Sequence, residues 1–121
     1  MTGVLLLAHG SREGDTEKTM ETITQYVKEE LNNDMIEEAY LQFRDKNLEN
    51  GLKSLIERGA DTIAIIPYFL FEGVHIKEDI PNEINEFMKD YPNVTINFGS
   101  TLGTDRRLAQ IVADRVRALV K

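Results

Sequence analysis

The sequence predicts an α/β fold: a four-stranded parallel sheet with the strand order 2-1-3-4 and helices on both faces. Four short apolar segments alternate along the 121 residues with four stretches whose apolar residues recur at helical spacing, and this alternation is typical of a parallel sheet. The first and third segments are the most continuously apolar, as expected of central strands, whereas the second and fourth have polar residues at alternate positions, as expected of edge strands. Neither a long linker nor a low-complexity segment interrupts the pattern, so we expect a single domain over residues 1–121.

The first unit begins with the apolar run from Val4 to Ala8, which predicts a strand buried on both sides. The helix that follows should begin at a polar cap residue, either Asp15 or Thr16, because such side chains accept hydrogen bonds from the first helical N–H groups. Its apolar stripe consists of Met20, Ile23, Val27 and Leu31.

In the second unit, apolar residues alternate with Tyr40 and Gln42. This alternation predicts an edge strand that contains Ala39, Leu41 and Phe43. A helical stripe follows, and we expect it to stop at Gly59, because glycine readily adopts the left-handed conformation in which many helices end. The stripe consists of Leu48, Leu52, Leu55 and Ile56.

The third strand is expected between Ile63 and Leu70, a run that is apolar apart from Pro67 and Tyr68. The helix after it has Pro81, which is tolerated in a first helical turn, and should stop before the pair at 91–92, Tyr-Pro. Its stripe consists of Ile80, Ile84, Phe87 and Met88.

The fourth unit has a short alternating strand, formed by Val94, Ile96 and Phe98. Its helix should begin near Thr104 or Asp105. The apolar stripe of this last helix consists of Leu108, Ile111, Val112, Val116 and Leu119.

Composition narrows the chemistry open to the chain. The sequence has no apolar run of the roughly 18 to 20 residues that a membrane span needs, and its first residues lack the basic segment of a signal peptide, so we expect a cytoplasmic protein. The chain has no cysteine, which excludes disulfides, thiolate metal sites and cysteine nucleophiles. The net charge of -7 argues against a nucleic-acid partner and means that local donors must hold any anionic ligand.

Both histidines of the chain are expected to meet at one place. The order 2-1-3-4 makes strands 1 and 3 neighbours, about 4.8 Å apart, and the winding of the sheet reverses between them. Ligands of such sheets bind at this switch point, beyond the carboxyl ends of the strands. His9 directly follows strand 1, and His75 follows strand 3 after a loop long enough to return to the same crevice.

Several residues near this crevice have a structural and a functional interpretation. His9, taken alone, is equally well explained as a hydrogen-bonded loop residue, and its convergence with His75 favours the functional role. Ser11 and Arg12 either shape a turn or form an anion-binding corner with the free N–H groups before the first helix. Gly10 serves loop geometry as well as it would serve close approach of a ligand.

The same choice applies further along the chain. From its sequence position alone, Asp45 is better explained as the cap of the second helix than as a ligand contact. Three aromatic residues are first of all strand core, with an apolar wall for a flat ligand as their functional role; they are Tyr68, Phe69 and Phe71. Lys77, Glu78 and Asp79 are most simply explained as the solvated start of a helix.

Three segments carry a family resemblance. "LLLAHGSR" near the N-terminus, "PYFLFEGVHIKEDIP" in the middle and "STLGTD" before the last helix resemble the short-form sirohydrochlorin cobalt/nickel chelatases, the CbiX-small type of class II chelatase. The resemblance covers essentially the whole chain in the same order, and the pairing of the first two segments makes it specific. Two features depart from the pattern: a histidine-rich insertion of some relatives is absent, and Glu72 occupies a variable position in the loop.

The resemblance implies a single chelatase-like half-domain that inserts Co²⁺ or Ni²⁺ into sirohydrochlorin without ATP, in the biosynthesis of cobalamin or coenzyme F430. It assigns the catalytic base to His9 and the metal ligands to His9 and His75, and it makes the metal a substrate, with no permanently bound cofactor. The substrate-binding residues it implies are Asp45, Leu70, Phe71, Glu72, Gly73, Val74 and His75. The substrate's carboxylates need donors, and we expect these to be Ser11, Arg12, Lys77 and Arg106.

Two histidines suit such a task. An imidazole, whose unperturbed pKa is about 6.5, can be neutral at cellular pH and then bind cobalt or nickel or accept a proton. Two ligands leave coordination positions open, so the metal can leave for the macrocycle, whereas a closed site of four ligands would trap it. Because related larger chelatases resemble two such units in one chain and this sequence has no internal repeat, we expect a homodimer.

Two other functions stay open at this point. A non-catalytic metal- or tetrapyrrole-binding module would use the same residues, and only turnover separates it from an enzyme. A histidine-dependent phosphoryl-transfer enzyme is the weaker alternative, since phosphatases of that type have Arg directly before the histidine, where this chain has Ala8.

Overall fold

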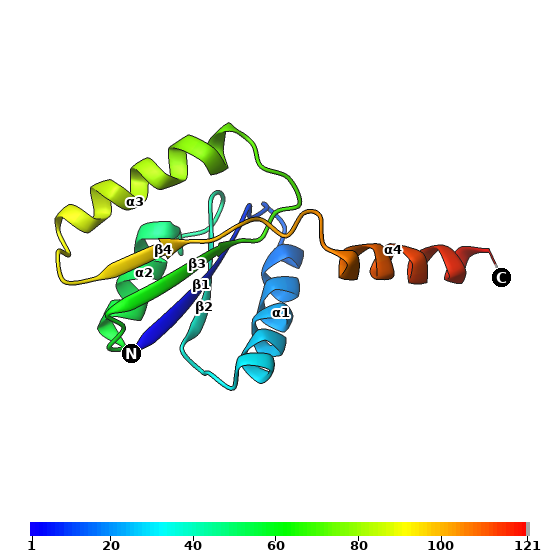
Figure 1. The fold of residues 1–121 in the computed structure, drawn as a ribbon, viewed down its shortest axis with the longest axis horizontal. Helices are drawn as coiled ribbons and strands as arrows, with labels where there is room; N and C mark the ends of the chain where they lie inside the picture. Colours follow the sequence, from blue (N-terminus) through cyan, green and yellow to red (C-terminus); the bar gives the residue numbers. More distant parts are fainter. Residues whose placement is uncertain (121) are drawn as a thin grey trace.

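The computed structural model describes residues 1–120, with the side chains of His75 and Ile76 outside the described part. Its strands form one parallel sheet in the order β2-β1-β3-β4 (Figure 1), which confirms the predicted topology. In chain order the elements are β1 (Thr2–Ala8), α1 (Asp15–Leu31), β2 (Ile36–Tyr40), α2 (Leu48–Glu57), β3 (Thr62–Pro67), the π-helical turn η1 (His75–Asp79), α3 (Ile80–Lys89), β4 (Thr95–Phe98) and α4 (Arg106–Leu119).

Each face of the sheet has its own apolar core. Because side chains alternate along a strand, Leu5 and Leu7 of β1 face α2 and α3, while Val4 and Leu6 face α1. The α2 and α3 side holds the larger cluster, including Leu52 and several other fully buried side chains. Full burial of one such side chain stabilises the fold by roughly 2 kcal/mol. Because side chains of both β1 and β3 belong to this cluster, its packing holds the two strands side by side.

The second strand lies earlier in the chain than the sequence predicts. β2 covers Ile36–Tyr40 rather than residues 39–43. The chain still follows β1 for two more residues, with Leu41 and Gln42 donating N–H hydrogen bonds to the carbonyls of Ala8 and His9, and then turns at Phe43, whose φ is 65°. The alternation seen in the sequence therefore continues past the point where the strand ends.

The early start of β2 does not show in the sequence pattern because this part of the strand contains a buried carboxylate. Glu37 is only 8% exposed although glutamate is rarely buried. Its carboxylate accepts hydrogen bonds from Lys46, Ser54 and Arg58, which belong to the loop after β2 and to α2 and its end. This network pairs the charge and joins β2 to α2.

Helix boundaries follow the predicted signals with two exceptions. Gly59 ends the second helix with φ 105°, and Asp105 caps α4 by accepting the N–H of Arg107, as expected. At α2, however, the cap is Asn47, whose side chain accepts the N–H of Asn50, so the prediction that Asp45 caps this helix is wrong.

At α1 the residue before the helix is Gly14, and it makes no side-chain cap. The predicted cap candidates therefore do not serve: Asp15 is the first helical residue, and the hydroxyl of Thr16 donates instead to Ser11 Oγ at 2.9 Å. The loop after β1 is held by this side-chain bond rather than by a capping bond.

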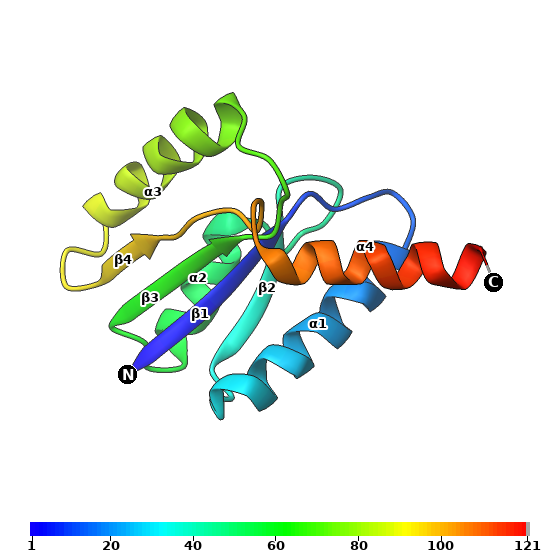
Figure 2. The same ribbon diagram turned by 45° about the vertical axis from the view of Figure 1, so that its right-hand side comes forward.

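The last helix forms where the sequence predicts it but covers neither face of the sheet. Both views show α4 projecting away from the body (Figures 1 and 2). Within residues 106–119, all of which the structure describes, no side chain is buried. Helices on both faces are thus supplied by α1 on one side and by α2 and α3 on the other. Among the described helices, none has the length and apolarity needed to cross a membrane.

Candidate functional site

A cavity of about 530 Å³ lies at the carboxyl ends of the central strands. Its walls come from the end of β1, the residue after β2 and the loop after β3. They consist of His9, Leu41, Tyr68, Phe69, Leu70, Phe71, Glu72 and Gly73. The cavity therefore occupies the switch point between β1 and β3, where the strand order predicts a ligand site.

His9 is the imidazole of this cavity. Its ring lies edge-on to that of Phe69, with the centroids 4.4 Å apart and the planes at 65°. The His9 side chain is exposed, while its backbone is tied to the neighbouring loop by the N–H of Gln42, which donates to the His9 carbonyl at 2.9 Å. The backbone hydrogen bond thus fixes the position of the His9 main chain, and the ring of Phe69 packs against the imidazole.

Gly10 allows this arrangement. Its φ is 86°, a conformation that favours glycine, and a Cβ at this position would collide with the carbonyl oxygen of Gln42. Of the two interpretations open from the sequence, loop geometry is the one that the contacts of Gly10 support.

The loop after β3 forms the apolar side of the cavity. Tyr68 continues the strand by donating its N–H to the carbonyl of Leu7 at 2.7 Å, and the N–H of Leu102 donates to the carbonyl of Phe69 at 2.8 Å. Beyond these anchors, Leu70 and Phe71 are exposed, Phe71 by 82% of its surface. Exposed apolar side chains around a cavity that holds an imidazole fit a flat, apolar ligand that carries a central polar group.

The loop after β1 contains the predicted anion contacts. The Ser11 hydroxyl donates to the Glu13 carbonyl at 2.7 Å and accepts from Thr16, so it serves the loop itself. The guanidinium of Arg12 lies over the ring of Phe43, 5.1 Å from its centroid. Both lie just after His9 in the chain, although neither lines the cavity.

The structure brings some predicted site residues together and separates others. His9 and the first four residues of the predicted loop, Leu70 to Gly73, line one cavity. Val74 is exposed next to them, and Lys77 is exposed on η1. Asp45 is exposed after β2, where its carbonyl accepts hydrogen bonds from Asn47 and Asn50.

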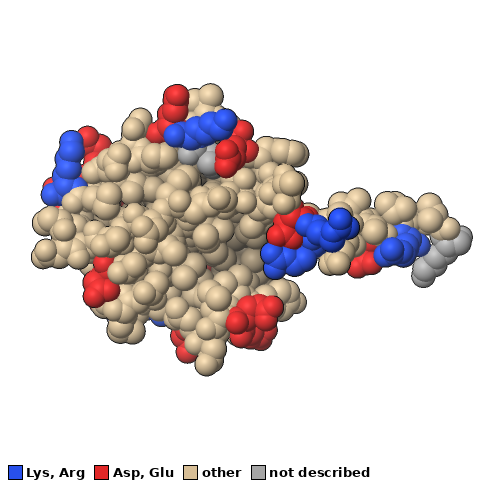
Figure 3. Space-filling view, in the orientation of Figure 1, with Lys and Arg blue, Asp and Glu red and all other residues tan. Residues whose placement is uncertain are grey.

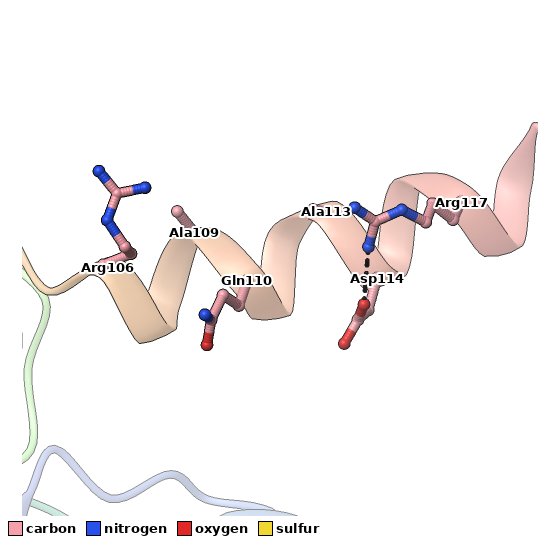
Figure 4. A pocket seen from close by; sticks show the side chains of 6 residues that line it. All are labelled: Arg106, Ala109, Gln110, Ala113, Asp114 and Arg117. Atoms are coloured by element: carbon pink, nitrogen blue, oxygen red, sulfur yellow. Dashed lines mark hydrogen bonds and ion pairs between the residues drawn. The ribbon is translucent and has the colours of Figure 1, made fainter.

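The side chain of His75 lies outside the described part of the structure, so its role as a metal ligand stays a prediction. Arg106 is on α4, where it lines a groove along that helix rather than the cavity (Figure 4).

Sequence reasoning missed two residues near the site. Leu41 lines the cavity because it directly follows β2, whereas the alternation in the sequence placed it inside the strand. Phe43 adopts the positive φ of the turn after β2, and its ring contacts the guanidinium of Arg12. A positive φ cannot be predicted from a phenylalanine in the sequence. Among the described side chains, no group of three or more His, Cys, Asp or Glu residues is arranged to hold a metal ion.

Comparison with known proteins agrees with this architecture. The family model described as CbiX matches residues 3–119. A sirohydrochlorin cobaltochelatase from Methanopyrus kandleri is 29% identical over 97% of this chain and 96% of that protein. A sirohydrochlorin ferrochelatase from Priestia megaterium is 33% identical over 96% of this chain, which spans only 44% of that protein's length.

Solved structures show the same fold. The sirohydrochlorin chelatase SirB from Bacillus subtilis subspecies spizizenii, in complex with cobalt, superposes with a TM-score of 0.88 at 26% identity, over 97% of this chain and 50% of that chain. A CbiX structure from Marinobacter aquaeolei VT8 superposes with a TM-score of 0.83 at 24% identity over 99% of this chain and 98% of that chain. With a family model matched over nearly its whole length, the chain belongs to the CbiX family.

Proposed function

We propose that this protein is a sirohydrochlorin chelatase, which inserts a divalent metal into the macrocycle without ATP. The observation that carries the proposal is the position of His9: an exposed imidazole beside Phe69, in an aromatic-walled cavity at the switch point of the sheet. Relatives of the same family that align over the whole chain are named sirohydrochlorin cobaltochelatases.

The chemistry requires a base and a temporary metal ligand. When M²⁺ binds the four nitrogens of the ring, two pyrrole N–H groups lose their protons, so a base near the ring centre assists insertion. A neutral His9 can accept one of these protons while the other passes to solvent, and an imidazole is also a suitable ligand for cobalt and nickel. In this proposal His75 is the second ligand, and the remaining coordination positions stay open for transfer to the ring.

The apolar wall then positions the macrocycle. Phe69 and Phe71 offer ring faces and edges to the flat substrate, and burial of apolar surface on both partners drives binding. We assign the peripheral carboxylates to donors near the cavity, with Arg12 and Lys77 as two cations that lie within four residues of cavity residues in the sequence.

The metal is cobalt or nickel in this proposal, in a cytoplasmic pathway to cobalamin or coenzyme F430. Imidazole ligands with open positions accept both ions, so availability in the cell contributes to the choice. Relatives named ferrochelatases make iron the third metal to test. Competition between Co²⁺, Ni²⁺ and Fe²⁺ at equal free concentration measures the preference, and strict exclusion of either cobalt or nickel contradicts the open site.

We also propose that the working unit is a homodimer. The alignment with SirB covers this chain almost completely but only half of SirB, so two copies of this chain would match one SirB chain in length. A second copy would cover the open side of the cavity and enclose the macrocycle better than one copy can.

The decisive experiment is a turnover assay. A substoichiometric amount of the protein is mixed with sirohydrochlorin and Co²⁺, and the absorbance change of metallation is followed and compared with a protein-free control. Many turnovers per chain are expected. Conversion that stops at one equivalent would instead favour a metal- or tetrapyrrole-binding module, and a rate equal to the control would overturn the proposed chelatase activity.

A further inference from the structure

The segment between β4 and α4 lies against the wall of the cavity, and the proposed function gives it no role. Residues 100–105 of this segment are the motif STLGTD. The N–H of Gly99 donates to the carbonyl of Ile65 at 2.8 Å, and the N–H of Leu102 donates to that of Phe69 at 2.8 Å. This strap, residues 99–103, therefore follows β3 past its carboxyl end and reaches the loop that forms the apolar side of the cavity.

Gly103 packs directly against the main chain of that loop. A Cβ at this position would lie only 2.0 Å from the carbonyl oxygen of Leu70, far inside any real contact distance. The φ of Gly103 is not positive, so glycine is required here for close approach rather than for backbone conformation. Any side chain at this position would push Leu70 and the strap apart.

The turn that joins the strap to α4 is fixed on both sides. Thr104 has a φ of 58°, which is unfavourable for a β-branched residue, and such a conformation persists only where the surrounding contacts hold it. The strap holds it on one side. On the other side, Asp105 accepts the N–H of Arg107 at 2.9 Å and pairs with its guanidinium at 2.7 Å. Figure 3 shows acidic and basic side chains adjoining where the projecting helix meets the body.

The strap contacts the two loop residues that lie nearest to the imidazole in the chain. Phe69 packs its ring edge-on to that of His9, with the centroids 4.4 Å apart, and Leu70 lines the cavity beside it. Further along, the loop is open: Phe71 is exposed by 82% of its surface, and a Cβ on Gly73 would meet no atom within 4 Å. The position of the wall next to His9 therefore depends on the main-chain contacts with the strap.

The anchor of His9 itself lies on the other side of β1. The N–H of Gln42, in the segment after β2, donates to the His9 carbonyl at 2.9 Å, and β2 and β3 flank β1 on opposite sides. A shift of the strap would therefore move the apolar wall and leave the His9 main chain in place. Such a shift should affect the macrocycle more than the metal ion.

We propose that Leu102 and Gly103 are positioning residues of the reaction, which hold Phe69 and Leu70 in place for the macrocycle through main-chain contacts. This inference rests on the proposed function and goes beyond it, because it assigns substrate affinity to a motif that does not itself line the described cavity.

The first experiment measures KM for both substrates in Gly103→Ala. The added Cβ displaces Leu70, so KM for sirohydrochlorin should rise about tenfold while KM for Co²⁺ stays within about twofold of wild type. The matched control is Gly51→Ala, whose Cβ would lie 2.8 Å from Cδ1 of Leu5 in the core under α2, so it disturbs the fold away from the wall and should leave both KM values unchanged. Circular dichroism checks that both variants fold.

Three results of this experiment overturn the proposal. They are wild-type KM values in Gly103→Ala, an equal rise in both of its KM values, and the same selective rise in Gly51→Ala.

The second experiment needs no substrate. The chain has two histidines, so NMR identifies the His9 ring protons once His75→Gln has removed the other set of signals. The ring current of Phe69 shifts these protons, and Phe69→Leu marks their position without it. Gly103→Ala should move the His9 signals toward that position, whereas Gly51→Ala should not. Unmoved His9 signals in Gly103→Ala overturn the proposal.

Amide exchange of the wild type is decisive if Gly103→Ala does not fold. Bound sirohydrochlorin orders the wall, and because the strap and the wall form one unit, exchange of the Leu102 N–H should slow. An unchanged rate in the complex overturns the proposal.

These measurements keep the two proposals apart. A protein whose His9 signals move in Gly103→Ala but which shows no turnover retains the strap and loses the proposed activity. Full turnover with unmoved signals does the reverse.

Discussion

The rings of His9 and Phe69 meet edge to face, 4.4 Å between centroids, at the point where β1 and β3 end. Phe69 owes its position to the loop after β3, whose backbone is bonded both to β1 and to the segment before α4. The imidazole that follows β1 is therefore supported by an aromatic ring that follows β3. This contact depends on the pairing of β1 with β3 in the sheet.

Replacement of His9 by Ala should abolish turnover and leave the fold intact. The His9 side chain is exposed and contributes little to the core, while loss of a general base lowers rates by about 10² to 10⁴. Initial rates with sirohydrochlorin and Co²⁺ measure the effect, and a thermal melt checks the fold. We expect the same result for His75→Ala; wild-type turnover at limiting metal in both folded variants would show that the site is elsewhere.

Phe71→Ser should weaken substrate binding without affecting stability. Phe71 is largely exposed at the wall of the cavity, so its loss costs the fold little but removes apolar surface from the ligand. We expect KM for sirohydrochlorin to rise about tenfold, for a loss of about 1.4 kcal/mol. Leu31→Ser, an exposed apolar residue at the end of α1, is the matched control, and a KM of Phe71→Ser equal to that of the control would remove the loop from the binding site.

Gly10→Ala should both destabilise the protein and reduce turnover. The positive φ and the collision of a Cβ with the Gln42 carbonyl force the loop to move, at a cost of about 1 to 3 kcal/mol. Gly14→Ala, in the same loop, meets no atom within 4 Å and should change the free energy of unfolding by less than about 0.5 kcal/mol. Urea unfolding of both variants distinguishes them, and equal stabilities would contradict the geometry described for Gly10.

Glu37→Gln should destabilise the protein at neutral pH, and the difference from wild type should shrink in acid. Burial raises the pKa of the Glu37 carboxyl, but the hydrogen bonds from Lys46, Arg58 and Ser54 outweigh burial and leave the pKa below its ordinary value. A lowered pKa means that the ionised form stabilises the fold above pH ~4.3 and that this contribution is lost as the pH falls through the folded pKa.

Removal of this buried charge should cost about 2 kcal/mol at pH 7. The matched control is Glu86→Gln, which breaks an exposed pair with Lys89 and should cost less than about 0.5 kcal/mol. Unfolding in urea at pH 7 and at several lower pH values down to pH ~2.5 gives the comparison. A difference between wild type and Glu37→Gln that stays constant over this range would show that the charge of Glu37 is unimportant.

The predicted strand order and the location of the cavity were accessible from the sequence because both follow from local patterns. Continuous apolar runs identify β1 and β3 as central strands. Because these two strands are neighbours, His9, which directly follows the carboxyl end of β1, lies at the switch point of the sheet. The loop residues Leu70 to Gly73 are instead implied by the family resemblance, since the residues by themselves indicate an apolar wall only at Tyr68, Phe69 and Phe71.

Contacts between residues distant in sequence depend on how the elements pack and could not be predicted from local patterns. Glu37 can be buried only because α2 and the residue after it supply partners for its charge. A charged residue is not expected in a buried strand, so the start of β2 could not be predicted from the sequence. The contact of Arg12 with Phe43 likewise depends on a left-handed turn that residue type does not specify.

The last helix shows the division most clearly. Its apolar stripe at helical spacing determined that residues 106–119 form an amphipathic helix, because spacing is a local property of the chain. The same stripe would suit any apolar surface, so spacing carries no information about which surface it meets. That choice was made by the bond from Leu102 to Phe69 and the tight packing of Gly103, which turn α4 away from its own sheet and leave the apolar stripe of α4 exposed.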